Sequence, residues 1–232
     1  MKDHFAFAGI ASPERRRLHT AARASIGDMS EDEVGEFALA CWAEPEREYQ
    51  YAACDEIERA AAKGRLSRAS LDVLGHLIVT KPWWDTCDVL CRHGVGSIAH
   101  PSRAVADRRA ALGLVEAWLE SENQWLVRSA LLHQERWGAV MDAERLFRFS
   151  QRHHADRRFF VAKALGWNLR TYAGVAPRAV ARAISAAPPA SALSECSTPA
   201  EQVADFVRRH PKLNSTARRE AVRGAVRAGA AI

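Results

Sequence analysis

Apolar residues recur at intervals of three and four along most of the chain, the spacing that places them on one face of an α-helix. The stretch SEDEVGEFALACW opens with Ser30 and Glu33 in a capping-box pattern and continues with an apolar face. Pro45 suits the first turn of the next helix, which Gly64 ends. Because no convincing run of alternating polar and apolar residues indicates a strand, the pattern predicts an all-α protein.

Helical periodicity continues through most of the remaining sequence. The further helix candidates are SLDVLGHLIVT, SRAVADRRAALGLVEAWLES, NQWLVRSALLHQERW, DAERLFRFSQRHH, DRRFFVAKALGWNLRTY, PAEQVADFVRRH and STARREAVRGAVRA. Residues 177–199 interrupt this series with a stretch rich in alanine, serine and proline, in which PPAS predicts a loop. Since no linker separates two parts elsewhere, the sequence predicts a single domain over residues 1–232.

The helices also repeat. An aromatic residue begins an apolar stretch at Tyr49, Trp84, Trp125 and Phe159, with spacings of 35, 41 and 34 residues. A period of roughly 35 to 45 residues with two helices per unit is typical of an α-solenoid of HEAT type. Such a solenoid is curved, and its concave face suits an extended ligand such as a nucleic acid duplex.

Composition narrows the class of protein. The chain has 232 residues, 48% of them hydrophobic, which is enough for a sizeable core and argues against disorder. No apolar run approaches the roughly 20 residues that span a bilayer. The N-terminal stretch FAFAGIA is followed at once by PERRR, unlike a signal peptide, whose charges come first. These features predict a cytosolic protein without a membrane partner.

The cysteines and the net charge say less about the class of protein. The five cysteines are odd in number and scattered, which argues against a disulfide framework. Cys87, Cys91 and His93 fit no common zinc spacing and lack a second half-site, so small core residues on a helix are the simpler interpretation. The net charge of +5 is compatible with a polyanionic partner. Seven basic and three acidic residues follow from Glu201 onward, although solvated helix faces explain them equally well.

The stretch KPWWDTCDVL carries the first chemical candidates. Trp84 and Asp88 are four residues apart, so on a helix they lie one above the other. An indole face beside a carboxylate attracts a cation, the ring through its quadrupole and the acid through its charge. The alternative is that Trp84 is a core residue and Asp88 a cap or a salt-bridge partner.

Two later stretches add indoles and cations at helical spacing. In WLVRSALL, Arg128 follows Trp125 by three residues. In KALGWNLRTY, Trp167 lies four residues after Lys163 and three before Arg170. If the repeats stack, these side chains and the Trp84 helix can line one groove. Its cations suit phosphates, and its indoles and carboxylate suit a positively charged group, which an alkylated base would supply.

With these stretches in order, the sequence resembles the AlkD-like family of DNA alkylation repair enzymes, which are HEAT-like solenoids. The resemblance covers nearly the whole chain, through MKDHFAFAGIASPERR, EPEREYQYAACDEI, VTKPWWDTCD, WLVRSALL, FFVAKALGWNLRTY and STARREAV. It implies a monofunctional glycosylase that removes cationic methylated purines, such as 3-methyladenine and 7-methylguanine, from duplex DNA. It also implies that the base is not flipped into a pocket and that no metal or organic cofactor is needed.

The resemblance assigns roles residue by residue. The implied catalytic residues are Asp88, Trp84, Trp167 and Arg128, and the implied DNA contacts are Arg170, Lys163 and Trp125. Asp88 would stabilise the cationic sugar left by the departing base and orient the attacking water. The partner is duplex DNA with alkylated bases, bound on a basic concave face. A monomer in the bacterial cytosol, associated with the nucleoid, is expected.

Two departures and three alternatives stay open. Family members usually have a further N-terminal helical segment before the position of Met1, which this sequence is expected to lack. Residues 177–199 are extra sequence that can alter how the basic C-terminal helices meet DNA. Lys163 could form a Schiff base and act as a lyase, although a phosphate contact is the simpler role. A non-catalytic HEAT-like protein that binds branched or damaged DNA, and a protein-interaction scaffold, also fit an α-solenoid.

Overall fold

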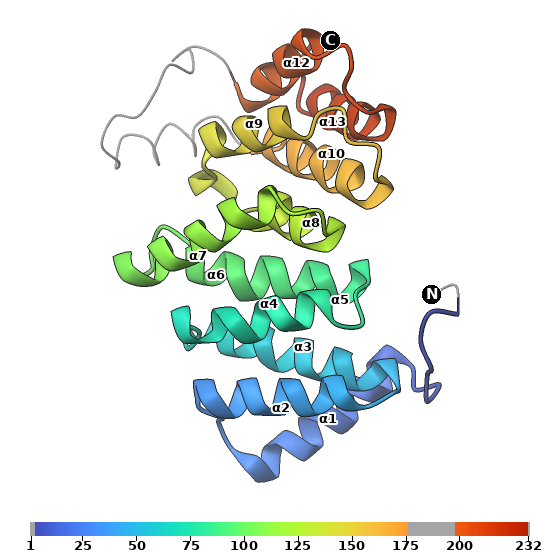
Figure 1. Ribbon diagram of the computed structural model, residues 1–232, viewed down its shortest axis with the longest axis vertical. Helices are drawn as coiled ribbons and strands as arrows, with labels where there is room; N and C mark the ends of the chain where they lie inside the picture. The colour runs from blue at the N-terminus through green and yellow to red at the C-terminus, as the bar shows by residue number, and fades with distance from the viewer. Residues whose placement is uncertain (1–2, 176–197, 232) are drawn as a thin grey trace. The chain divides into compact units, whose positions relative to one another are not determined.

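The computed structural model describes residues 3–175 and 198–231, and helices make up most of both ranges (Figure 1). Within them the only extended pairing is an isolated bridge between Ala6 and Glu46. The all-α prediction is therefore confirmed, and the paired helices fit an α-solenoid. The curvature of that solenoid and a basic concave face stay predictions. None of the described helices is long and apolar enough to cross a membrane.

The chain forms two compact units, Met1–Gly113 and Leu114–Ile232. The first contains α1 (Ser12–Ile26), α2 (Glu31–Ala43), α3 (Arg47–Ala62), α4 (Leu71–Val79), α5 (Trp84–Val89) and α6 (Gly96–Ala99). Helix α7 (Val105–Leu119) includes the boundary. The second contains α8 (Gln124–Leu132), α9 (Ala143–Arg152), α10 (Phe159–Ala173), α12 (Pro199–Arg209) and α13 (Ser215–Arg227). The single domain over residues 1–232 stays a prediction.

Local sequence signals explain most helix ends. The backbone N–H of Glu33 donates to Ser30 Oγ at 3.3 Å, and the Ser30 N–H donates to Glu33 Oε2 at 2.7 Å, so the predicted capping box at the start of α2 is confirmed. Gly64 follows the end of α3 with a φ of +68°, as a stop requires. Pro45 differs from the prediction: α3 begins at Arg47, because the backbone at residue 46 is extended and pairs with Ala6.

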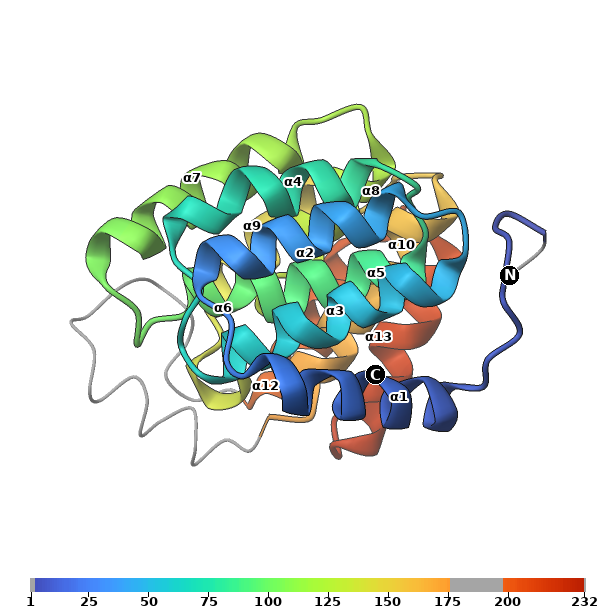
Figure 2. The same ribbon diagram turned by 90° about the horizontal axis from the view of Figure 1, so that it is seen from below.

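The first unit has two helical layers. Helices α2 and α4 lie in one layer and α3 and α5 in the other, as both views show (Figure 1, Figure 2). Ile57 of α3, Leu74 of α4 and Leu90 after α5 are buried between them. The repeat inferred from aromatic spacing is consistent with this arrangement, since Tyr49 and Trp84 both lie in the first turn of a second-layer helix.

The second unit is built around α10, which packs against α8, α12 and α13. Its core includes the fully buried side chains of Leu131, Leu165, Leu169 and Val203. Most of the predicted insertion at residues 177–199 lies outside the described residues. Its last two residues are described: Thr198 caps α12 by accepting from the Glu201 N–H at 3.2 Å, and Pro199 is the first helical residue.

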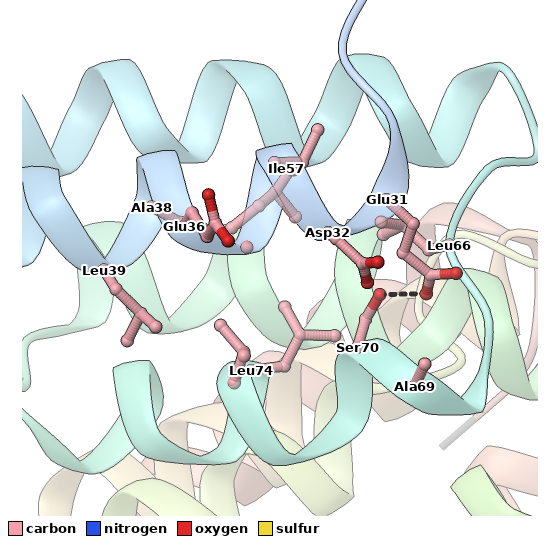
Figure 3. Close-up of a pocket in the computed structure, with 13 residues that line it drawn as sticks. Glu31, Asp32, Glu36, Ala38, Leu39, Ile57, Leu66, Ala69, Ser70 and Leu74 are labelled. Carbon is pink, nitrogen blue, oxygen red and sulfur yellow. Dashed lines mark hydrogen bonds between the residues drawn. The ribbon is translucent and has the colours of Figure 1, made fainter.

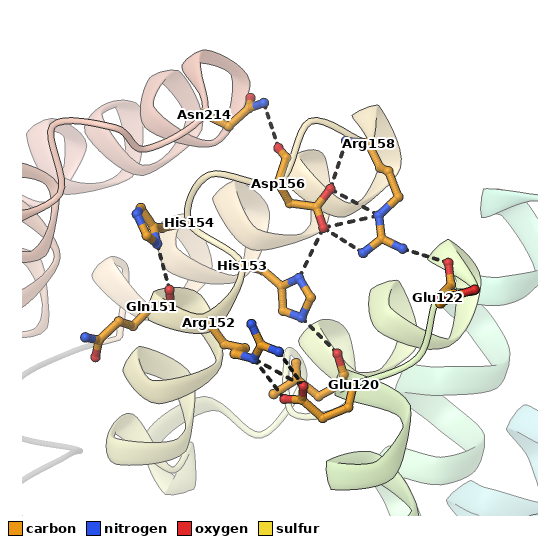
Figure 4. A network of polar contacts seen from close by, with 10 residues as sticks. Glu120, Glu122, Gln151, Arg152, His153, His154, Asp156, Arg158 and Asn214 are labelled. Atoms are coloured by element: carbon orange, nitrogen blue, oxygen red, sulfur yellow. Dashed lines mark hydrogen bonds and ion pairs between the residues drawn. The ribbon is translucent and has the colours of Figure 1, made fainter.

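A polar network ties the ends of several helices in the second unit together (Figure 4). His153 contacts the Leu119 carbonyl oxygen through Nε2 at 2.8 Å and Asp156 Oδ2 through Nδ1 at 3.1 Å. Arg158 pairs with Asp156 at 2.7 Å and donates to the Glu122 carbonyl at 2.8 Å. Asn214 Nδ2, at the start of α13, donates to the Asp156 carbonyl at 2.9 Å. Asp156 is thus the centre of this network.

Asp156 is expected to contribute a pH-dependent part of the stability. Burial alone raises its pKa, but hydrogen bonds from Arg158 and His153 outweigh burial and lower the pKa from 3.8 to about 2. A lowered folded-state pKa stabilises the protein above pH 3.8, and that stability is lost as the pH falls towards 2. Asp156→Asn should therefore lower the free energy of unfolding at pH 7 by about 1–2 kcal/mol, measured by urea denaturation.

The matched control for this variant is Glu120→Gln, which removes the exposed ion pair with Arg152 in the same network (Figure 4). Solvent screens such a pair, so little change in unfolding is expected. The difference between wild type and Asp156→Asn should shrink between pH 4 and pH 2. A constant difference over that range would show that the carboxylate charge of Asp156 does not stabilise the fold.

Candidate functional site

Helix α5 holds both residues of the pair that the sequence singled out. Trp84 is the first residue of the helix and has 45% of its surface exposed, so it does not belong to the core. Asp88 follows one turn later and is only 4% exposed. In most proteins a large indole is buried and a carboxylate is exposed to solvent. Here the indole is exposed and the carboxylate is buried. The indole and the carboxylate that the sequence predicts to attract a cation thus lie on one helical turn, with only the indole open to solvent.

The α-helical hydrogen bonding is interrupted directly after this pair. Residues Leu90–Val95 form a π-helical segment between α5 and α6, an irregularity that is frequent at functional sites. The Asp88 carbonyl oxygen accepts hydrogen bonds from Arg92 Nε at 3.0 Å and from Cys91 Sγ at 3.6 Å. Side chains thus satisfy a backbone oxygen at the point where the two helical patterns meet. No local sequence signal predicted this segment.

A cluster formed by Arg47, Tyr51, Asp85 and Thr86 supports the first turn of α5; it is here called the buried cluster, although Tyr51 and Asp85 are only half-buried. Arg47 is completely buried and pairs with Asp85 through Nη2 at 2.7 Å and Nε at 3.3 Å. Its Nη2 also donates to Thr86 Oγ1 at 2.7 Å. The Tyr51 hydroxyl donates to Asp85 Oδ2 at 2.6 Å. Asp85 thus anchors α5, and the chemical role predicted for Asp88, the other carboxylate near it on the helix, stays a prediction.

Sequence reasoning missed this buried cluster, although part of a signal was present. Arg47 and Tyr51 are four residues apart and so share a face of α3, and Asp85 follows the two tryptophans directly. The two segments are more than 30 residues apart in the chain. Only the stacking of α3 on α5 brings them together, and a helical pattern does not specify which opposite charges meet.

In the second unit, α10 presents the second group of candidates along one face. Lys163, Trp167 and Arg170 are spaced by four and three residues and are all half-buried, while Leu165 and Leu169 point into the core. The Arg170 guanidinium carbon lies 5.9 Å from the centre of the Trp167 ring, within the range of a cation–π contact. The spacing predicted from KALGWNLRTY is thus realised as one mixed aromatic and basic strip.

Glu220 of α13 lies against this strip and was not anticipated. Its carboxylate is buried and accepts from Lys163 Nζ at 2.7 Å and from Arg170 Nη1 at 2.6 Å. The ammonium group of Lys163, together with Arg170, holds the pKa of Glu220 below its usual value, although burial opposes this. One acid therefore orients two cations and offsets part of their charge.

Arg128 and Trp125 of α8 lie deeper than the strip. Arg128 is buried and donates from Nη1 to the Phe160 carbonyl oxygen at 2.7 Å, at the start of α10. Trp125 is 6% exposed, and its ring centre lies 4.8 Å from that of Phe160. Both side chains hold α8 against α10. The DNA contact predicted for Trp125 is not tested by this position and stays a prediction.

The structure therefore gathers five of the candidates into two groups, and Arg128 and Trp125 lie on α8 against the start of α10. Trp84 and Asp88 are together on α5 in the first unit, and Lys163, Trp167 and Arg170 are together on α10 in the second. The predicted convergence of both groups in one groove stays a prediction. Among residues 3–175 and 198–231, no three His, Cys, Asp or Glu side chains are placed to share a metal ion.

Two hollows differ in their suitability for phosphate. One of about 590 Å³ in the second unit is lined by Arg170, Arg227 and small residues that include Gly174 and Gly224. Its two guanidinium groups and small walls suit a phosphate. One of about 300 Å³ lies between α2 and α4 in the first unit, where Glu31 accepts from Ser70 (Figure 3). Glu31, Asp32 and Glu36 line this second hollow and would repel phosphate.

Comparison with known proteins agrees with these features. The family of DNA alkylation repair enzymes matches the chain over residues 1–224. Among solved structures, one described as a predicted DNA alkylation repair enzyme from Enterococcus faecalis is similar, with a TM-score of 0.67. It shares 24% identity over 95% of this chain and 88% of that chain, a likeness that shows a common fold. None of the curated proteins matches the chain significantly.

Proposed function

The chain belongs to the family of DNA alkylation repair enzymes, and from this membership we propose that it is a glycosylase. Its role is in the repair of alkylated DNA, and DNA is its partner. The proposed reaction is hydrolysis of the N-glycosidic bond of cationic alkylated purines, such as 3-methyladenine and 7-methylguanine, in duplex DNA. We further propose that it acts as a monomer on DNA in the bacterial cytosol.

The observation that carries this proposal is the pairing of an exposed indole with a buried carboxylate on one turn of α5. Trp84 is accessible to a ligand, and the burial of Asp88 limits competition from water for its charge. A fixed carboxylate of this kind stabilises positive charge that develops nearby, and an indole face does the same through its quadrupole. The pair suits a reaction whose transition state is cationic.

Hydrolysis of an alkylated purine nucleotide has such a transition state. The bond between the sugar C1′ and the purine N9 breaks, and the base leaves with the bonding electrons, which cancel its positive charge. The sugar becomes oxocarbenium-like. In the proposed mechanism Asp88 stabilises this sugar and orients a water molecule, whose oxygen adds to C1′ while its proton passes to Asp88 and then to solvent. Free base and an abasic site are the products.

The other candidates take binding roles in this proposal. Trp84 and Trp167 would hold the deoxyribose, and Arg128 and Arg170 the phosphates beside the lesion. The support for Arg170 is its place in the basic hollow with Arg227. The alkylated base already carries the charge that makes it leave, so it need not be flipped into a deep pocket. Binding through phosphates should weaken strongly as salt is raised.

A test of reaction type separates hydrolysis from the lyase alternative. Lys163 already donates to Glu220, so we expect no Schiff base on it. Duplex DNA with one 7-methylguanine should yield free base and an abasic strand that breaks only on later alkaline treatment. Borohydride added during the reaction should trap no protein on DNA.

The control for this test is Lys163→Ala, assayed in parallel for base release and for trapping. Trapping by wild type that is lost in Lys163→Ala would overturn hydrolysis in favour of a lyase. DNA binding without any base release would instead favour the non-catalytic DNA-binding protein. Base release by both proteins, with an uncut strand, is the outcome expected of the proposed glycosylase.

A further inference from the structure

The N-terminal residues 4–10, here called the strap, lie against the buried cluster beneath α5. The Phe5 ring centre is 3.9 Å from the guanidinium carbon of Arg47, and the Ala6 carbonyl oxygen accepts from the Arg47 N–H at 2.9 Å. The His4 ring centre is 4.2 Å from that of Trp83, the residue directly before α5. The strap thus contacts Arg47 of α3 and Trp83, which directly precedes α5.

Residues 8–10 of the strap are hydrogen-bonded to Glu48 of α3. Glu48 accepts hydrogen bonds from the backbone N–H groups of Ala8, Gly9 and Ile10 at 3.1, 3.0 and 3.2 Å. Gly9 has a φ of +81°, a conformation that glycine adopts without strain and that lets three successive N–H groups face one carboxylate. Burial of Glu48 raises its pKa, but hydrogen bonds from its own backbone N–H and from those of Ala8, Ile10 and Gly9 outweigh burial, and the pKa is lowered.

The strap closes the buried cluster to solvent through Phe5. Arg47 has no exposed surface, and Asp85 retains only a tenth of its side-chain surface. An ion pair in such surroundings is held in one geometry, since water does not compete for its hydrogen bonds. Removal of the Phe5 ring would open the guanidinium to water and loosen its hold on Asp85. Asp85 directly follows Trp84 and precedes Asp88 by three residues on the same helix.

We propose that Phe5 is a positioning residue for base excision, because it seals the Arg47–Asp85 pair and thereby fixes Trp84 and Asp88 on α5. This inference rests on the proposed function. Phe5 acts through Arg47 and touches none of the reacting atoms. Phe5 is therefore the strap residue that orients the candidate residues, and the other six strap residues, His4 and Ala6 to Ile10, are exposed.

The test compares Phe5→Ala with Phe7→Ala, which removes an exposed ring from the same strap. Phe5→Ala should lower the single-turnover rate of 7-methylguanine release at saturating enzyme about 10- to 100-fold, as a small misplacement of reacting groups does. The Kd for DNA should stay unchanged, and the protein should stay folded at the assay temperature. Phe7→Ala should match wild type, and Phe5→Tyr, which keeps the ring over Arg47, should restore the rate.

A second readout does not depend on activity. With 5-fluorotryptophan incorporated, the fluorine resonance of Trp84, assigned from its absence in Trp84→Phe, should shift or broaden in Phe5→Ala and not in Phe7→Ala. Tyr51→Phe, which removes one hydrogen bond to Asp85, should change the same resonance. An unchanged resonance in Phe5→Ala would overturn the inference, whatever the response of Tyr51→Phe. Wild type that releases no base, with a resonance that responds, would overturn the proposed function alone.

Discussion

Asp88→Asn is expected to lose the release of alkylated purines, by on the order of 10²- to 10³-fold, while DNA binding and folding persist. The substitution keeps the size of a side chain that is only 4% exposed, and it removes the negative charge. A developing sugar cation interacts with that charge more strongly than the substrate does. The loss should therefore fall on the rate of the chemical step rather than on binding.

The measurement is base release from methylated duplex DNA under enzyme excess, with DNA binding measured in parallel. Asp72→Asn is the matched control, because Asp72 is an exposed carboxylate on α4 in the same unit. It should retain the rate of wild type. Release by Asp88→Asn at the rate of wild type would show that the Asp88 charge is not used in the reaction, and the assignment of Asp88 would be wrong.

Gly224→Ala should strongly destabilise the second unit. An added Cβ on α13 would lie 2.6 Å from Arg170 Cα and 2.9 Å from the Arg170 carbonyl oxygen, both backbone atoms of α10. The two helices would have to separate, so the free energy of unfolding should fall by about 1–3 kcal/mol. The displaced α10 would also carry Arg170 away from its partner Glu220, so DNA binding should weaken.

Gly113→Ala is the control for this variant. Gly113 lies inside α7, and an added Cβ there meets no atom within 4 Å. Alanine favours helix over glycine by up to about 1 kcal/mol, so this variant should be unchanged or more stable. Urea denaturation of both variants gives the comparison. Equal stability of Gly224→Ala and wild type would mean that α10 and α13 do not approach as closely as the glycine requires.

The helical class and the local caps follow from the sequence because each depends on neighbours within one or two turns. The capping box at Ser30 and the pairing of Trp84 with Asp88 on one helix are examples. The four aromatic residues that revealed the repeat each lie in the first turn of a helix, but Trp125 is buried whereas Tyr49, Trp84 and Phe159 are exposed. The spacing therefore predicts that each aromatic residue lies in the first turn of a helix, but it does not predict whether that residue is buried.

The contacts that position the candidates could not be predicted in the same way. Arg47 meets Asp85 across 38 residues, and Lys163 meets Glu220 across 57. Such pairs depend on which helices stack and on their rotation, and many acids and bases in the chain satisfy the same pattern. The π-helical segment after Asp88 likewise depends on tertiary packing, including the approach of Leu74 to Gly94.

The most direct test of the proposed function is release of free base by wild type. Duplex DNA with a single 7-methylguanine should yield free 7-methylguanine in a single turnover, and a matched duplex with 8-oxoguanine, a neutral lesion, should yield no base. This difference is expected because in the proposed mechanism the positive charge makes the alkylated base a good leaving group, and a fixed carboxylate stabilises the sugar. A folded protein that binds both duplexes and releases base from neither would contradict the glycosylase.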